Sequence, residues 1–259
     1  MDIRAYNREA WNRYVEGGEN PWTRAVSPET IAKARQGQIS ILLTEQKPVP
    51  RDWFPPLKGT DTLCLACGGG QQGPVLAAAG ANVTVFDNSP RQLDQDRYVA
   101  EREDLSNLAT VEGDMRDLSV FADESFDFIF HPVSNLFIHE IRPVWREAYR
   151  VLRPGGTMLA GFMNPTFYLF DIDKAEAGIL EVKFKLPYSD LDHPEVAEKL
   201  MAEGDALENS HTLTDQLGGQ LEAGFHIIGL YEDHHSDFII GEYMPTYIAT
   251  RALKPLERP

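Results

Sequence analysis

The glycine-rich segment at residues 63–73 has the residue types and spacing to bind a nucleoside-containing ligand. Its sequence, LCLACGGGQQG, follows a polar lead and precedes a predicted helix that begins near Pro74. Glycines between a strand and a helix let backbone N–H groups approach a ligand closely, and the helix N-terminus points at that ligand. Gly68, Gly70 and Gly73 match the G-x-G-x-x-G spacing, so this segment alone is also compatible with an NAD-dependent oxidoreductase.

Asp87 is the second residue with chemistry to offer this ligand. It ends an apolar run at residues 82–86 and follows the glycines by about 20 positions. A carboxylate at this place can accept hydrogen bonds from both hydroxyls of a ribose. Aspartate is also a common helix N-cap, but the apolar strand directly before Asp87 favours the ribose role. The two features predict a nucleoside-containing cofactor at the carboxyl ends of a parallel sheet.

Three further segments follow the glycine turn in order, namely VFDNSPRQL, VEGDMRDLSVFADESFDFIF and REAYRVLRPGGTMLAGF. With LCLACGGG they span about residues 61–163, and the ordered set resembles the class I S-adenosylmethionine-dependent methyltransferases, most closely their small-molecule, ubiquinone-biosynthesis-like type 11 branch. The resemblance implies S-adenosyl-L-methionine as cofactor, S-adenosyl-L-homocysteine as product and a small-molecule methyl acceptor that the sequence does not identify. It also implies an α/β fold, a three-layer Rossmann-like doubly wound sheet of seven mostly parallel strands whose antiparallel seventh strand lies between the fifth and the sixth.

The resemblance assigns binding roles to residues that match the family's motifs. The Asp114 carboxylate would receive the adenine amino group, and the Met115 N–H would serve a ring nitrogen. Cys64 stands where the family has an acid, and Ala66 where it has its first glycine. Gln71 and Gln72 could supply replacement polar groups. The residues predicted to bind the cofactor are Ala66, Cys67, Gly68, Gly70, Gln71, Asp87, Asn88, Gln92, Asp114, Met115, His131 and Pro132.

His131 is the candidate catalytic residue. It ends the predicted fourth strand and begins the sequence HPVS, at the edge of the sheet where ligands of α/β proteins bind. Histidine there could act as a general base toward a hydroxyl or thiol acceptor, or it could only hydrogen-bond the cofactor or the loop. In the branch of the resembled family that methylates amino groups of nucleic acids, a D/N-P-P-Y/F motif occupies this place. Because HPVS has neither the acid or amide nor the aromatic residue, a nucleobase acceptor is disfavoured.

Two sets of residues have side chains that could bind a metal ion or form a redox pair. Cys64 and Cys67 form a C-x-x-C pair, but no second pair completes a zinc site, so we expect two small buried residues on opposite faces of a strand. Asp233, His234 and His235 are adjacent, and adjacent residues do not converge on one ion without ligands from elsewhere. We therefore expect a solvated loop there and no metal.

The elements that position these residues alternate between strand and helix, as in a mostly parallel sheet. The predicted strands are 62–67, 82–87, 108–112, 126–131, 156–163, 225–230 and 247–253. The predicted helices of the core are 73–80, 89–104, 137–152 and 212–223.

Two segments lie outside this alternation. Residues 1–58 are predicted to form a helical N-terminal cap over the cofactor site, with an amphipathic helix across residues 31–43, or else a helix on the outer layer. Residues 59–259 would form the methyltransferase domain, with an inserted lid at about 164–210. This insertion carries aromatic residues and many acids, and we expect the acids to form a solvated face rather than a cation pocket.

The charge and hydrophobicity of the sequence limit the kinds of partner that we expect for this protein. The 259 residues include 24 basic and 40 acidic ones, and a formal net charge of −16 repels phosphate backbones, so we expect no nucleic acid as partner. No apolar run is long enough to span a bilayer and no signal segment is visible, so we expect no membrane partner and a cytoplasmic location. A non-catalytic S-adenosylmethionine-binding protein stays open as an alternative, and the oligomeric state is unknown.

Overall fold

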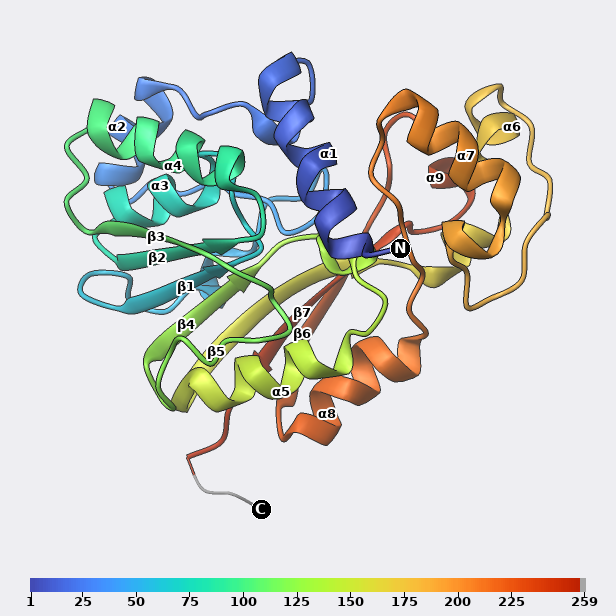
Figure 1. Ribbon diagram of the computed structural model, residues 1–259. Helices are drawn as coiled ribbons and strands as arrows, with labels where there is room; N and C mark the ends of the chain where they lie inside the picture. Colours follow the sequence, from blue (N-terminus) through green and yellow to red (C-terminus); the bar gives the residue numbers. More distant parts are fainter. Residues whose placement is uncertain (257–259) are drawn as a thin grey trace.

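The protein is built on a seven-stranded sheet, as the sequence predicts (Figure 1). The computed structural model describes residues 1–256, and within them the strand order is β3-β2-β1-β4-β5-β7-β6. Neighbours from β3 to β5 pair in parallel, and β7 pairs antiparallel with both β5 and β6. The strands are β1 (Asp61–Leu65), β2 (Asn82–Asp87), β3 (Leu108–Glu112), β4 (Phe126–His131), β5 (Leu152–Met163), β6 (His226–Asp233) and β7 (Tyr247–Leu253).

Helices cover both faces of this sheet. In Figure 1, α2, α3 and α4 lie on one face, and α5 and α8 lie on the other. The helices are α1 (Ile3–Gly17), α2 (Pro28–Arg35), α3 (Gln72–Ala78), α4 (Pro90–Arg102), α5 (Arg142–Val151), α6 (Ile172–Glu176), α7 (Pro194–Glu203), α8 (Gly219–Ala223) and α9 (Ile240–Tyr243). The expected three-layer, doubly wound α/β class is therefore confirmed.

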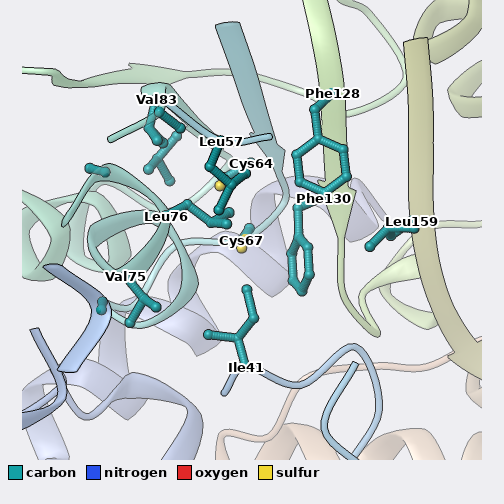
Figure 2. Close-up of a cluster of buried hydrophobic side chains, with 14 of the residues drawn as sticks. Ile41, Leu57, Cys64, Cys67, Val75, Leu76, Val83, Phe128, Phe130 and Leu159 are labelled. Carbon is teal, nitrogen blue, oxygen red and sulfur yellow. The ribbon is translucent and has the colours of Figure 1, made fainter. Parts of the chain in front are cut away.

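Alternation along the central strands creates two hydrophobic cores. Phe128 and Phe130 of β4 join the core beneath α3, whereas Ile129 between them joins the core beneath α5. Successive strand residues point to opposite faces, so an apolar strand between two helical layers feeds both cores. Figure 2 shows the first core, which also contains Cys64 and Cys67.

The two cysteines correct one expectation. Both are free and buried, as expected of small apolar residues, but they lie in the same core rather than on opposite faces. Strand β1 ends at Leu65, and Ala66 then adopts a left-handed conformation with φ of 47°. The strand alternation therefore stops between the two cysteines.

Two predicted helices are shorter than expected. The amphipathic helix across residues 31–43 is wrong in its second half, because α2 ends at Arg35 and Gly37 has a φ of 77°. Ile41 and Leu43 still reach the core, from an irregular segment. The helix expected at 137–152 begins only at Arg142, with Pro143 in its first turn.

The N-terminal helix and the insertion meet at the carboxyl edge of the sheet. Helix α1 lies beside α4, and α6, α7 and α9 gather on the other side of α1 (Figure 1). The insertion has its own buried cluster, in which Phe167, Tyr168 and Tyr188 pack with Ile240 of α9. Among residues 1–256, no helix is long and apolar enough to cross a membrane.

Candidate active site

A cavity of about 670 Å³ opens at the carboxyl ends of the parallel strands. Its size lies within the range of small-molecule and cofactor sites. Ligands of doubly wound sheets bind where the strand order reverses, which here is between β1 and β4. Residues at or after the ends of four strands, together with one residue of α4, line this part of the cavity, namely Ala66, Cys67, Gly68, Gln71, Asp87, Asn88, Gln92, Asp114, Met115 and Pro132. Ten of the predicted cofactor-binding residues are thus brought together.

The glycine turn lies directly against Asp87 and α4. Gly68 donates its N–H to Asp87 Oδ2 at 2.9 Å, and a Cβ on Gly68 would lie 2.6 Å from the Cβ of Gln92. Only glycine fits this approach. Gly69 donates its N–H to the buried carboxylate of Asp96 at 3.1 Å. This hydrogen bond makes the carboxyl group of Asp96 part of the support beneath the turn. Burial raises the pKa of Asp96 to about 8.

Asp87 presents its carboxylate at the cavity. Its Oδ1 accepts the N–H of Ser89 at 2.9 Å, while Oδ2 accepts that of Gly68. Burial raises the pKa of Asp87, and the backbone donors oppose that rise. Each carboxylate oxygen has a second lone pair, so ribose hydroxyls can still donate to this group.

Asp114 lies on the same edge and pairs with two arginines. Arg116 donates to both of its oxygens at 2.7–3.1 Å, and Arg4 of α1 lies 3.7 Å from Oδ2. Burial opposes the effect, but the hydrogen bonds from Arg116 hold the pKa of Asp114 below its usual range. Arg4 also donates to Asn88 Oδ1 at 2.9 Å. Helix α1 is therefore fastened to both residues that would flank the adenosine.

Gln92 carries a buried oxygen that favours a polar ligand here. The residue is 5% exposed and lines the cavity, and its Oε1 has no hydrogen-bond donor among residues 1–256. An orphaned buried acceptor is costly unless a donor reaches it. With the close approach at Gly68 and the carboxylate of Asp87, this makes the site fit a nucleoside-containing cofactor.

Gly70 and His131 do not line the cavity. The carbonyl of Gly70 accepts the N–H of Val26, and a Cβ there would meet the backbone of Gln95 at 2.8 Å. Gly70 therefore packs the turn against α4 and the N-terminal segment.

His131 is fully buried, and both of its ring nitrogens are engaged. Nδ1 hydrogen-bonds Leu65 O at 2.9 Å, and Nε2 hydrogen-bonds Asn135 Oδ1 at 2.6 Å. Burial lowers the pKa of His131, and the contacts with Leu65 and Asn135 oppose that shift. The prediction of a general base at the mouth of the acceptor site is corrected, because the imidazole has no free nitrogen and no contact with the cavity. His131 instead joins the end of β4 to β1.

Gln71 has a role that the sequence did not reveal. Its side-chain amide donates to Pro21 O at 2.8 Å and to Arg24 O at 3.0 Å, so it holds the N-terminal segment over the glycine turn. The main chain adds a hydrogen bond from Val26 N to Gly70 O at 2.9 Å.

The cavity continues into a second part that sequence analysis missed. Beyond the predicted cofactor residues it is lined by aromatic and acidic side chains of the insertion, among them Tyr168, Tyr188, Asp190 and Glu208. Asp190 is 4% exposed, so it does not belong to the solvated face expected of the acids in this insertion, although others, such as Asp192 and Glu203, are exposed. The signal was the interleaving of tyrosines with these acids, which a solvated face does not need.

The expected solvated loop around Asp233 is also corrected. Asp233 is 2% exposed and accepts backbone N–H groups of residues 45–47 and the hydroxyl of Thr44. His235 lines the cavity with its ring stacked near Phe167 at 6.4 Å. No group of three or more His, Cys, Asp or Glu within the described chain could hold a metal ion.

Comparisons with known proteins decide the family. A model of the methyltransferase domain family matches residues 63–160. An uncharacterized methyltransferase of Bacillus subtilis, YbaJ, is 52% identical over 252 residues, which cover 96% of this chain and 98% of that protein. The chain belongs to the class I S-adenosylmethionine-dependent methyltransferases of the type 11 branch.

Other similarities agree with this membership. A sterol 24-C-methyltransferase of Aspergillus fumigatus is 34% identical over 101 residues, 38% of this chain and 26% of that protein. A demethylmenaquinone methyltransferase of Listeria welshimeri is 32% identical over 104 residues, 39% of this chain and 44% of that protein. Among solved structures, an S-adenosylmethionine-dependent methyltransferase from Mesorhizobium loti aligns with a TM-score of 0.61 at 19% identity, covering 78% of this chain and 94% of that one.

The predicted cofactor is confirmed by this membership, because the family uses S-adenosylmethionine. The NAD-dependent alternative and the non-catalytic alternative are set aside with it.

Proposed function

We propose that this methyltransferase transfers a methyl group to a small-molecule acceptor held in the part of the cavity lined by the insertion. The observation that carries the proposal is the continuity of the cavity, which runs from the glycine turn to Tyr168 and Glu208 without leaving the protein. A concave space of about 670 Å³ suits a cofactor and a small organic molecule rather than a polymer.

We propose that Asp87, Asn88, Asp114 and Gln92 hold the adenosine, and that the turn at residues 66–69 faces the methionine end. When bound, S-adenosylmethionine supplies a methyl group on a sulfonium with an excellent leaving group. The chain then needs to supply proximity, orientation and exclusion of water. A mechanism without a general base is consistent with His131, the one histidine predicted as a base, because its two ring nitrogens contact Leu65 and Asn135.

Residues 1–58 and 164–210 are proposed as the cap and the lid of this site. Asn7 of α1 contacts both the segment after β4 and the end of the insertion, because it donates to Phe137 O at 3.0 Å and to Leu207 O at 2.8 Å. Tyr14 of α1 donates to Asp205 Oδ1 at 3.0 Å. The small-molecule acceptor, the absence of a nucleic-acid partner and the cytoplasmic location stay predictions.

Turnover is the direct test. The protein is incubated with S-adenosylmethionine and pools of small metabolites, and formation of S-adenosylhomocysteine is followed with a methylated product identified by mass. Methylation of a small molecule supports the proposal. Methylation only of RNA, DNA or protein would contradict the acceptor class and leave the family assignment intact.

A further inference from the structure

The far end of the cavity has a wall of definite chemistry, which we call the distal wall. It consists of Tyr168, Tyr188, Asp190, Asp205 and Glu208, all of which line the cavity. Tyr168 is 4% exposed and Tyr188 is 7% exposed. The wall is therefore an interior surface, and its carboxylates face the space in which the acceptor must lie.

Each carboxylate of the distal wall is held by a tyrosine hydroxyl. Tyr168 donates to Glu208 Oε2 at 2.8 Å, and Tyr188 donates to Asp190 Oδ1 at 2.6 Å. Asp205 receives the hydroxyl of Tyr14 from α1. The hydroxyls fix the carboxylates in place, but they bring no positive charge.

The lysine and arginine side chains that line the cavity form ion pairs with acids outside the distal wall. Arg4 pairs with Asp114, Lys183 with Asp171 at 3.0 Å, and Lys199 with Asp173 at 2.8 Å. None of the three carboxylates of the distal wall has an ion-pair partner from lysine or arginine among residues 1–256. Where these carboxyl groups are ionised, their negative charge therefore has no lysine or arginine beside it in the described part of the chain.

That charge is costly without a ligand. Burial raises the pKa of Glu208 to about 7, and the neighbouring charges of Asp190 and Asp205 add to the rise. Burial likewise raises the pKa of Asp190, which the Tyr188 hydroxyl and the nearby His193 oppose. A cation placed here would be favoured, and an anion would be repelled.

Aromatic faces complete the surroundings. The rings of Tyr168 and Tyr188 stack with centroids 5.4 Å apart, and Phe184 lies 4.9 Å from Tyr188. Tyr188 also stacks on His193, with centroids 5.1 Å apart, so these rings pack largely against one another beside the carboxylates. An aromatic face that stays uncovered attracts organic cations through its ring quadrupole, most strongly where water is excluded. Carboxylates beside aromatic faces are the chemistry that recognises an ammonium group on a small organic molecule.

We propose that the methyl acceptor of this enzyme carries a basic nitrogen, bound as an organic ammonium ion by Glu208 and Asp190 against the rings of Tyr168 and Tyr188. This proposal rests on the proposed function, because it names the class of the acceptor in the same cavity. It concerns how the acceptor is held and does not specify which of its atoms receives the methyl group.

One competing use of the distal wall is stabilisation of the positive sulfonium of the cofactor itself. The two uses differ in what removal of the charge does. If the wall serves the sulfonium, Glu208→Gln weakens binding of S-adenosylmethionine and spares both S-adenosylhomocysteine and an ammonium probe. If it holds the acceptor, the same variant weakens the ammonium probe and leaves the two cofactor forms nearly equal.

The test uses three probes of similar size and different charge: phenethylamine, phenylethanol and phenylacetate. Calorimetry is performed on the whole protein saturated with S-adenosylhomocysteine at pH 8. We expect phenethylamine to bind at least about tenfold more tightly than phenylethanol, with phenylacetate weakest. Glu208→Gln and Tyr188→Phe should reduce that preference about tenfold, whereas the exposed Glu203→Gln on α7 should leave it unchanged.

A second measurement detects the proton that Glu208 releases when the ammonium probe binds. At pH 7 the bound ammonium should favour ionised Glu208, so binding should release protons and its enthalpy should change with the ionisation enthalpy of the buffer. Glu208→Gln should abolish this dependence, which a merely structural role would not do. Thermal melting confirms that each variant is folded.

Two results would overturn the proposal: equal or tighter binding of phenylacetate, or an unchanged preference in both Glu208→Gln and Tyr188→Phe. Failure of the wild-type protein to bind S-adenosylhomocysteine is measured first and would count against the proposed function instead.

Discussion

Gly68 and Asp87 are joined by a hydrogen bond of 2.9 Å from the backbone N–H of the glycine turn to the carboxylate at the end of β2. This bond closes the cofactor end of the cavity, because it holds the turn after β1 against the residue that would receive the ribose. The same carboxylate fixes the start of the next helix through Ser89. Asp87 therefore shapes the site as well as facing it.

Removal of this carboxylate should weaken cofactor binding. We expect Asp87→Ala to lower the affinity for S-adenosylhomocysteine by about 1.5–3 kcal/mol, the usual range for hydrogen bonds to a charged group. Calorimetry measures the change, with the exposed Asp94→Ala on α4 as control. An affinity equal to that of the wild type would show that the ribose is not held at Asp87.

His131→Ala should affect stability rather than chemistry. The substitution leaves Leu65 O and Asn135 Oδ1 without their partner inside the core, so we expect a loss of about 2–4 kcal/mol in the free energy of unfolding. Turnover per folded molecule should stay close to that of the wild type. Denaturant unfolding and steady-state kinetics separate the two effects, and a loss of about 100-fold in kcat with unchanged stability would restore the general base.

The contact of Gln71 with residues 21–24 should control access to the turn. Limited proteolysis with trypsin should cut after Arg24 in the free protein and more slowly with S-adenosylhomocysteine. Gln71→Ala removes two hydrogen bonds, each worth about 0.5–1.5 kcal/mol, so opening of the segment should be about fivefold to a hundredfold more frequent. Gln36→Ala, in the exposed residue after α2, serves as control. Identical cutting with and without ligand would argue against a cap.

Glu208 should make stability depend on pH. Its pKa is raised by burial from 4.5 to about 7, so the folded state holds this proton more tightly than the unfolded state does. Stability should therefore fall as pH rises from about 4.5 to 7, and the cost is fully present above pH 7. The titratable groups that act on Glu208 are Tyr168 of η4 (Pro165–Leu169), Asp190 of η5 (Asp190–Asp192) and Asp205, which follows α7.

Glu208→Gln removes this titration. The variant should gain stability relative to the wild type between pH 5 and pH 8, by at most about 3 kcal/mol. Thermal melting across this range measures the difference, with Glu203→Gln as the matched control. A difference between variant and wild type that does not change with pH would mean that Glu208 titrates at its ordinary pKa in the fold.

The sheet could be predicted from sequence because each of its strands is a short apolar run between turn residues. β2, β3, β4 and β7 begin and end at the predicted residues. The glycine turn and Asp87 could be predicted for the same reason, since their chemistry depends on a local strand, turn and helix.

The distal wall and the role of His131 could not be predicted, because they depend on partners far away in the sequence. Asp205 meets Tyr14 across 191 residues, and a run of acids does not reveal which of its members turn inward. His131 sits at the expected strand end, but its ring is turned edge-on to Trp145 at 5.9 Å and toward Asn135, away from the cavity.

The contacts between α1 and the end of the insertion affect the order in which the chain can fold during synthesis. Tyr6 and Asn7 find their partners Asp205 and Leu207 only 199 and 200 residues later. At about 5–20 residues per second of synthesis, the first helix waits on the order of 10–40 s after emerging before these partners exist. Because long-range contacts form late, we expect α1 to dock after the sheet has folded. Nascent chains that stop short of residue 205 would have β1 to β5 but neither β6 nor β7, and their first helix would lack its contacts with Asp205 and Leu207.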